Sequence, residues 1–276
     1  MGSEMCIRDR YTSTKFAVKN PYEVFIGGIM KANDVNDVHQ LLNVSMNPIT
    51  ISYSLPLKSE TIIPSYDNML RAIQQKLQEN NVLKPNYQFS FTLKQIDSYE
   101  QLALFFGEEI DLSDLFKITS PNPIHKTVAV LDISQSYFSI AMDMPEEELS
   151  NSPIVQEQLS ELIYVGSIEF GRRSILIVES DLNYQDVKVA LNEILNKSTT
   201  KKGDISEKSK SIMASSIIRG LILDPLANEN ITPNNPLEYL LDYINSDISP
   251  NDFGVPIFFT AAWLKDNSVF VNKFTN

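Results

Sequence analysis

The chain has 276 residues, of which 43% are hydrophobic and 21% are charged, and its formal net charge is -12. The apolar content suffices for one large domain or two smaller ones and argues against intrinsic disorder. An acidic chain repels phosphate backbones and anionic lipid surfaces. We therefore exclude nucleic acid from the expected partners and expect no polybasic membrane anchor.

Residues 1–10 have neither helix nor strand periodicity. The run Met5-Cys6-Ile7-Arg8-Asp9-Arg10 resembles a translated sequencing adaptor, so we expect residues 1–10 to be foreign to the fold, the alternative being a genuine short polar start. Cys6 is the single cysteine, so cysteine usage does not indicate a compartment. The sequence contains no run of 18 apolar residues, so no ready-made transmembrane helix is expected.

The first predicted elements alternate between strand and helix. Apolar and polar residues alternate over 47–56, which predicts a half-buried strand, and apolar residues recur at helical spacing over 67–79. Residues 87–96 and 127–144 are rich in aromatic and β-branched types and are both predicted to be strands. The second would span roughly 60 Å, so it must bend, twist or pass between domains.

The later elements complete an α+β pattern. Residues 162–179 and 212–223 form long apolar stretches, and 256–271 is a last strand-like piece. A helix is expected to begin at Pro236, with Asn234 and Asn235 as candidate caps. Together these elements predict a long, bent and twisted antiparallel β-sheet flanked by helical bundles.

Residues 101–114 fit two periodicities at once. Five apolar residues occupy even positions: Leu102, Leu104, Phe106, Ile110 and Leu112. Phe105 and Glu108 break this alternation, and much of the same set with Leu115 and Phe116 also forms a helical face.

A second segment has the same ambiguity. Val187, Val189 and Leu191 alternate with more polar neighbours, whereas Val187 and Leu191 continue with Ile194 and Leu195 as a helical stripe. Such a sequence can be a helix in water and an amphipathic hairpin in lipid, where each strand needs about 9–11 residues. The alternative is an ordinary amphipathic helix whose alternation is accidental.

Two further stretches carry a family resemblance. Pro256 opens a run that leads through Trp263 to four residues: Leu264, Lys265, Asp266 and Asn267. Upstream, Phe170, Gly171 and Arg172 follow one another. The first stretch resembles a Pro-Ile/Val-Ser-Tyr-Thr run followed by aromatic-Leu-Lys/Arg-Asp-Asn in the cholesterol-dependent cytolysins, or thiol-activated cytolysins, of the perforin-like superfamily. The second resembles that family's Tyr-Gly-Arg strand, with Phe170 in place of the tyrosine.

Three more blocks, 47–57, 135–145 and 179–187, are similar to family strands and occur in the family's order. In that family the two ambiguous segments correspond to helix bundles that refold into transmembrane hairpins, which implies hairpins at 99–121 and 183–206. The resemblance also implies a discontinuous body domain (21–89, 136–180 and 246–272) and a pore-forming domain (90–135 and 181–245). A C-terminal membrane-binding domain would lie outside this chain.

The function that the resemblance implies is that of a secreted pore-forming toxin acting on a host or target-cell membrane. Its subunits would form a homo-oligomer, pair through strand edges, and insert two hairpins each into a large β-barrel pore. The target membrane is the expected partner, with a sterol bound through the further domain, and no cofactor is expected. Gly171 and Gly220 mark the expected hinge or assembly strands, although the family has a Gly-Gly pair where Gly220 stands alone. The alternative is a non-lytic surface-binding or ring-assembly module on the same fold.

An enzyme is not expected. His39 and His125 are the two histidines, and neither has metal-ligand spacing or lies beside a nucleophile pattern. The sequence has no phosphate-cradling glycine loop. Arg172 and Arg173 are predicted to be solvated charges.

Overall fold

A computed structural model describes residues 10–36, 39–80, 88–107, 110–145, 148–200, 204–228 and 236–275. A nine-stranded antiparallel sheet has the order β2-β10-β8-β7-β4-β5, with β3 and β9 also paired to β8 and β6 to β7. Its strands are β2 (Phe16–Ala17), β3 (Ile29–Lys31), β4 (Ile49–Tyr53), β5 (Glu60–Ile62), β6 (Gln88–Ile96), β7 (Thr127–Met142), β8 (Leu162–Ser180), β9 (Ile217–Ile222) and β10 (Val255–Trp263). A separate pair joins β1 (Arg10–Ser13) to β11 (Asn272–Thr275).

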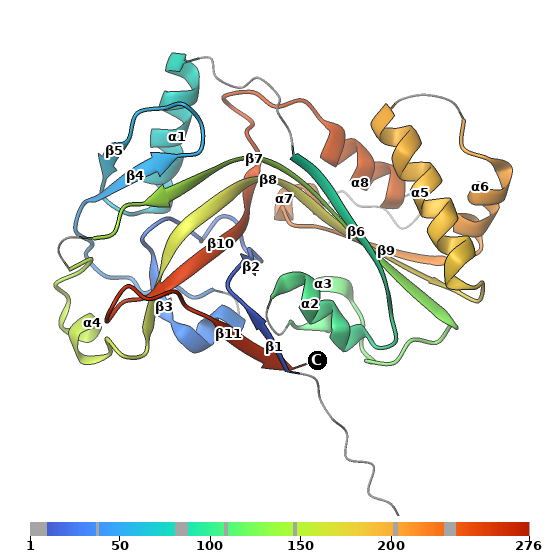
Figure 1. Cartoon of the computed structure of the whole chain (residues 1–276), viewed down its shortest axis with the longest axis horizontal. Helices are drawn as coiled ribbons and strands as arrows, with labels where there is room; N and C mark the ends of the chain where they lie inside the picture. The colour runs from blue at the N-terminus through green and yellow to red at the C-terminus, as the bar shows by residue number, and fades with distance from the viewer. Residues whose placement is uncertain are drawn as a thin grey trace, which may run out of the picture.

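The strands β7 and β8 run through the whole molecule (Figure 1). At one end β8 pairs with β10 and β3 while β7 pairs with β4, and at the other end β6 and β9 pair with β7 and β8. Two long apolar strands therefore connect both halves of the fold.

The sheet is irregular around Gly171. The β7–β8 register shifts between Ser136 and Phe138, opposite Gly171, and the β10–β8 register shifts just beyond Pro256. A Cβ atom on Gly171 would lie 2.1 Å from the carbonyl oxygen of Gln135, so only glycine fits this close backbone approach. Bulges bend a strand and increase its twist, which is how such long strands curve.

Helices cover both faces of the sheet (Figure 1). The 3-10 helices are η1 (Ala32–Asn36) and η2 (Tyr99–Leu102), and the α-helices are α1 (Tyr66–Asn80), α2 (Ala103–Phe106), α3 (Leu112–Phe116), α4 (Pro153–Glu157), α5 (Tyr184–Thr200), α6 (Glu207–Ala214), α7 (Pro225–Asn228) and α8 (Pro236–Asn245). The helix α1 packs on the half that contains β4 and β5, whereas α5, α6 and α8 lie at the β6–β9 end.

The predicted fold class, an α+β chain with a long antiparallel sheet, is confirmed. The predicted elements over 47–56, 67–79, 87–96, 127–144 and 162–179 correspond to β4, α1, β6, β7 and β8. The helix α8 begins at Pro236 as predicted, and its candidate caps Asn234 and Asn235 lie outside the described residues.

Two predicted boundaries were wrong, and one predicted apolar stretch is divided between a helix and a strand. The stretch 212–223 is divided, because the Ser215 and Ser216 hydroxyls both donate to the Ile212 carbonyl oxygen and end α6 before β9 begins. The stretch 256–271 is interrupted because the chain turns after Trp263. Arg10 begins β1 and so belongs to the fold, whereas residues 1–9 lie outside the described part of the chain.

Candidate functional site

At the β6–β9 end, the sheet carries apolar side chains on both faces. Val128 and Val130 of β7 point to one face and Ala129 and Leu131 to the other, as strand alternation requires. The first face is covered by η2, α2 and α3, and the second by α5, α6 and α8 (Figure 1). The two predicted hairpin ranges, here called the first segment (99–121) and the second segment (183–206), contain the stretches with double periodicity and flank the same strands.

The first segment is helical in short pieces. Leu102 and Phe106 are buried, whereas Leu104, Ile110 and Leu112 are half-buried. Glu108, which breaks the strand-like alternation, lies outside the described residues. The backbone changes direction at Gly107 (φ 75°) and at Lys117 (φ 56°), both in the left-handed region that ends helices.

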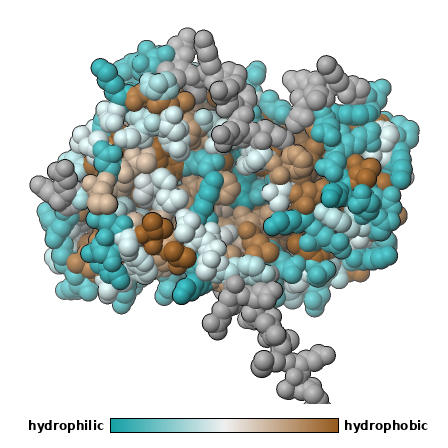
Figure 2. All heavy atoms as spheres, in the orientation of Figure 1, coloured by the Kyte–Doolittle hydropathy of each residue, from teal (hydrophilic) through white to brown (hydrophobic). Residues whose placement is uncertain are grey.

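The second segment begins with a regular amphipathic helix. In α5, Val187 and Leu191 are fully buried, together with Ala190, Ile194 and Leu195 of the same seam. Val189 is 53% exposed. The outer surface at the α5–α6 end is mainly hydrophilic, with small apolar patches (Figure 2). Of the three alternating residues, Val187 and Leu191 are therefore buried by the packing of α5 on the sheet, whereas Val189 is not.

Arg173 ties the first segment to β8. Its Nε and Nη2 donate to the two carboxylate oxygens of Asp132, each at 2.9 Å, and Nη2 also donates to the carbonyl oxygen of Phe105 in α2. The guanidinium carbon lies 4.4 Å from the ring centroid of Phe258. The prediction that Arg173 is solvated was wrong, because its side chain is only 1% exposed and its guanidinium forms an ion pair with Asp132.

Arg172 points to the opposite face of the sheet, which α8 covers. It donates to the carbonyl oxygens of Tyr243 (3.2 Å) and Ser246 (2.6 Å), where α8 ends, and pairs with Asp252 at 2.8 Å. A cation is favourable at the carbonyl end of a helix because the helix dipole is negative there. This arginine is also buried, contrary to the prediction.

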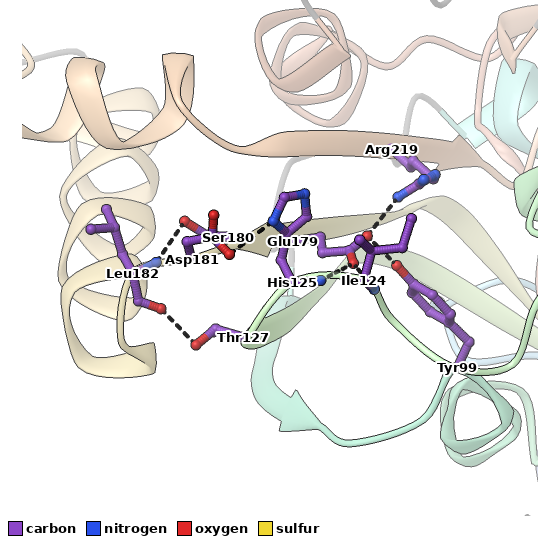
Figure 3. Close-up of polar contacts among 9 residues, drawn as sticks. All are labelled: Tyr99, Ile124, His125, Thr127, Glu179, Ser180, Asp181, Leu182 and Arg219. Atoms are coloured by element: carbon purple, nitrogen blue, oxygen red, sulfur yellow. Dashed lines mark hydrogen bonds and ion pairs between the residues drawn. The ribbon is translucent and has the colours of Figure 1, made fainter.

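Glu179, the penultimate residue of β8, gathers four donors (Figure 3). Its Oε1 accepts from the backbone N–H groups of Ile124 (2.6 Å) and His125 (2.8 Å). Its Oε2 accepts from the hydroxyl of Tyr99 (2.5 Å) and lies 3.3 Å from Nη1 of Arg219. Its side chain is 1% exposed.

These contacts shift two pKa values in opposite directions. Burial by itself raises the pKa of Glu179, but the hydrogen bonds from Tyr99, the two backbone N–H groups and Arg219 outweigh it and hold the pKa below its ordinary value. Burial, followed by the hydrogen bond to Glu179, raises the pKa of Tyr99. At neutral pH the cluster therefore holds a buried carboxylate and a neutral phenol.

The connection into the second segment is fixed beside this cluster (Figure 3). The His125 ring nitrogen Nδ1 lies 2.9 Å from Oδ1 of Asp181, and the Thr127 hydroxyl donates to the carbonyl oxygen of Leu182 at 2.7 Å. The side chain of Asn183 then accepts from the N–H of Asp186 at 3.0 Å, which caps the start of α5. The start of β7 and the start of α5 are thus held together.

Glu193 joins α5 to α6. It accepts from the hydroxyl (2.7 Å) and N–H (2.9 Å) of Ser206 and from the hydroxyl of Ser209 (2.5 Å), and it lies 3.0 Å from Nζ of Lys197. These bonds, the Ser206 hydroxyl first, lower the pKa of Glu193 to about 2. The ionised carboxylate therefore stabilises the corner between the two helices.

The remaining family-signature residues pack or form turns. Phe170 is fully buried and stacks on Phe138, with ring centroids 5.2 Å apart. A tight turn after β10 consists of Leu264, Lys265, Asp266 and Asn267. Asn267 has φ 58°, donates its N–H to the Trp263 carbonyl oxygen at 2.9 Å, and accepts from the Tyr164 hydroxyl at 3.1 Å.

Glycine 220 lies in β9, where it pairs with Leu176 of β8. The roles of Glu179, Tyr99 and Arg219 were missed by sequence reasoning, because these residues are far apart along the chain and form no local motif.

No group of three metal-ligating side chains occurs among the described residues. In the same part of the chain, every helix is too short or too polar to cross a membrane.

Comparisons with known proteins identify the fold and the family. Tetanolysin of Clostridium tetani is 25% identical over 279 residues, which cover 88% of this chain and 51% of tetanolysin. An early prepore of intermedilysin locked by a disulfide, with CD59, superposes with a TM-score of 0.72 at 18% identity, covering 97% of this chain and 62% of that one. A non-hemolytic pneumolysin from Streptococcus pneumoniae gives a TM-score of 0.70 at 15% identity, over 97% and 64% of the two chains.

The chain spans about half the length of the curated relatives it matches. They include perfringolysin O of Clostridium perfringens and pneumolysin, and a solved structure of pneumolysin shares the fold described above, with a TM-score of 0.69. The thiol-activated cytolysin model matches residues 7–276, almost the entire sequence. This chain belongs to the thiol-activated cytolysin family.

Proposed function

We propose that this protein is the body of a secreted pore-forming toxin rather than an enzyme. Its subunits assemble on a host or target-cell membrane, and each converts the first and second segments into two amphipathic hairpins of a β-barrel pore. Family membership supports the general activity. The assignment of these residues to the hairpins is the proposal's own, and it rests on the register of the sheet.

The register links the first segment to a defined face. Ile96 pairs with Val128, and Val128 pairs with Glu179, so these three residues share one face of the sheet. Residues two apart along a strand lie on the same face. If β6 continued beyond Ile96, it would bring these residues to that face: Leu102, Leu104 and Phe106.

The same counting applies to the other extensions. If β7 were extended backward from Val128, Ile110 and Leu112 would join this face, and extending β8 beyond Glu179 would add Val187, Val189 and Leu191. A slip of one residue would turn a whole set to the opposite face. When β6, β7 and β8 are extended in this way, all eight apolar side chains fall on the same face of the sheet. This agreement carries the proposal.

Assembly through strand edges completes the proposal. Among the described residues, β6 pairs on one side only, with β7, whereas β9 covers an edge of β8. The second hairpin would run from β8 into β9, so these two strands stay paired, and the other edge of β9 would pair with β6 of a second copy once the element beside it moves away. We assign Gly220 in β9 and Gly171 at the bulge as hinge positions. Residues 90–135 and 181–245 form the pore-forming part and 21–89, 136–180 and 246–272 the body.

A non-lytic assembly module is the second candidate. One of the solved structures that share this fold is described as a non-hemolytic pneumolysin. The fold is therefore compatible with the absence of lysis, and only a functional assay separates the two candidates.

The test is dye release from liposomes. A C-terminal histidine tag and nickel-chelating lipids supply membrane attachment, so that only assembly and insertion are measured. Val189→Asp should abolish release, because a charged side chain on the lipid face of a hairpin destabilises the inserted state, and every subunit of the barrel would carry one. Lys188→Asp, which falls on the opposite hairpin face, is the matched control and should leak. Equal leakage from both variants, or none from the tethered wild type, would contradict the proposed pore.

A further inference from the structure

We propose that the first hairpin turns at Asp111, Leu112 and Ser113, and that Asp111 is the positioning residue of this turn. The inference rests on the proposed function and deepens it, because it defines which residues of the first segment form each arm of the hairpin. It also adds Phe116 and Ile118 to the residues that would face lipid.

The register of β6 and β7 determines where a hairpin between these strands must turn. Every pair of their ladder, from Gln88 with Ser136 to Ile96 with Val128, is equidistant from position 112. A hairpin that continues both strands without a bulge keeps this symmetry. Its turn is therefore centred on Leu112.

Gly107 is the other candidate for the turn, because its φ of 75° already lies in the left-handed region. A hairpin centred on Gly107 would bring Ile96 opposite Ile118 instead of Val128, and it would break the ladder that β6 and β7 form. The existing ladder therefore favours Leu112 over Gly107 as the centre.

The residues around Leu112 already form a turn before insertion. One carboxylate oxygen of Asp111 accepts from the N–H of Ser113 (2.8 Å), the hydroxyl of Ser113 (2.8 Å) and the N–H of Asp114 (3.1 Å). Aspartate is favoured in turns because its side chain can bond the backbone two residues further on, as it does here. The same contacts cap α3, so Asp111 can serve the helix first and the turn of the hairpin later.

The two sides of this turn are also in contact before insertion. The helices α2 and α3 lie side by side (Figure 1), and the ring centroids of Phe106 and Phe116 are 6.3 Å apart. In the hairpin, Phe106 would lie directly opposite Ile118 and diagonally from Phe116, a spacing that aromatic side chains span. The contact between the two phenylalanines would therefore persist in the hairpin.

The arm that returns from this turn alternates like a strand. Phe116 and Ile118 fall at even positions and so join the proposed lipid face, whereas Lys117 and Thr119 fall on the other face. Both apolar side chains are buried before insertion. Asp114 also falls on the lipid face, but it lies beside the turn, at the membrane surface, where a charge costs little.

Cysteine pairs on the tethered chain test the position of the turn. In a Cys6→Ser background, Leu104→Cys and Ser120→Cys lie opposite each other if the turn is centred on position 112. The pair Leu104→Cys and Ile110→Cys does so if the turn is centred on Gly107. Each pair is mixed with an excess of wild-type chain, which forms the pores, and is treated with a short thiol crosslinker before and after vesicles are added.

We expect the first cysteine pair to gain intramolecular crosslinks when the vesicles leak, with no gain in the second pair. A gain in the second pair, or in neither pair, on leaking vesicles would overturn the assigned turn and leave the proposed pore intact. Absence of leakage from the wild-type chain would instead contradict the proposed function, and this inference with it.

The rate of dye release tests the role of Asp111. Asp111→Ala removes an acceptor from both α3 and the turn. If Asp111 acted only as a helix cap, its loss would free the first segment and speed release. We expect release to slow instead by about fivefold, comparable with the loss of a capping hydrogen bond, because the turn forms less readily.

Asp111→Asn keeps the side-chain acceptor and is the conservative variant that should restore the wild-type rate. Faster or unchanged release from Asp111→Ala would overturn the positioning role of Asp111. Equal slowing in Asp111→Ala and Asp111→Asn would overturn it as well.

Discussion

The first segment lies on one face of the sheet as short helices of four, four and five residues, whereas the second segment begins with a helix of 17 residues on the other face. Helices as short as the first set are not stable by themselves, since nucleation is unfavourable. Buried charged groups of β8, Arg173 and Glu179, hold that segment through Phe105 and Tyr99. The second segment depends instead on a continuous apolar seam, with a polar cap at its start and hydrogen bonds from Glu193 in the middle of α5 to Ser206 and Ser209.

The difference shows that two segments with the same proposed fate can be restrained by different forces. A few hydrogen bonds and ion pairs can be broken locally, by a change of charge or by the loss of a bonding partner. An apolar seam is lost only when the helix as a whole leaves the sheet. We therefore expect single polar substitutions to loosen the first segment selectively, and core substitutions to destabilise the second.

The largest effect should come from the apolar seam. Leu191→Ala should lower the free energy of unfolding by about 2–5 kcal/mol, because it leaves a cavity at a fully buried position. Val189→Ala on the same helix should change it by less than about 0.5 kcal/mol, as is usual for exposed sites. Urea titration measures both. Similar losses in the two variants would show that α5 is not packed on the sheet by this face.

The next effect concerns the adjacent arginines on opposite faces. Arg173→Leu should cost about 2–3 kcal/mol, because Asp132 and the Phe105 carbonyl oxygen lose a charged donor. Hydrogen exchange should then increase over residues 99–106. Arg172→Leu should instead increase exchange at the end of α8, where its acceptors lie. The same exchange pattern in both variants would contradict the assignment of separate faces.

A smaller effect is expected at the start of the second segment. Asn183→Ala removes the side-chain acceptor for the N–H of Asp186 and should cost about 1 kcal/mol. Asn183→Ser keeps an acceptor without placing a second carboxylate beside Asp186 and serves as the control. Thermal unfolding followed by circular dichroism measures both, and equal stability of Asn183→Ala and wild type would show that the cap contributes nothing.

The smallest effect is the pH dependence of the α5–α6 corner. The pKa of Glu193 is lowered from 4.5 to about 2, so its contribution is complete above 4.5 and is lost as pH falls through about 2. Glu193→Gln should flatten the dependence of stability on pH within this window, measured by urea titration at several pH values. An unchanged slope would assign the acid sensitivity to other groups.

Sequence periodicity was sufficient for the strands β4, β6, β7 and β8 and for the helices α1 and α8. Alternation over 47–56 and the apolar length of 127–144 and 162–179 determined β4, β7 and β8, because side-chain burial follows the period of the backbone. The same reasoning selected Val187, Val189 and Leu191, but it could not decide between helix and strand where both periods fit. Packing on the sheet decides in favour of the helix and leaves Val189 exposed.

The polar network could not be predicted in the same way. Arg173 looked like a surface charge because nothing near it along the chain indicates that Asp132 and Phe105 come within reach. The same holds for Glu179 and Tyr99, which are 80 positions apart. Periodicity reports which face a residue occupies, whereas partners from distant elements depend on the sheet register.

The central claim is that the lipid-facing residues of the second hairpin alternate as a strand rather than follow the helix. Single cysteines at positions 188 and 189, in a Cys6→Ser background, would carry an environment-sensitive dye on the tethered, membrane-assembled protein. We predict that the dye at 189 enters a nonpolar environment and is quenched by a lipid-phase quencher, while the dye at 188 stays in water. If the vesicles leak while both dyes remain in water, the claim is contradicted. It is also contradicted if both dyes enter the lipid phase.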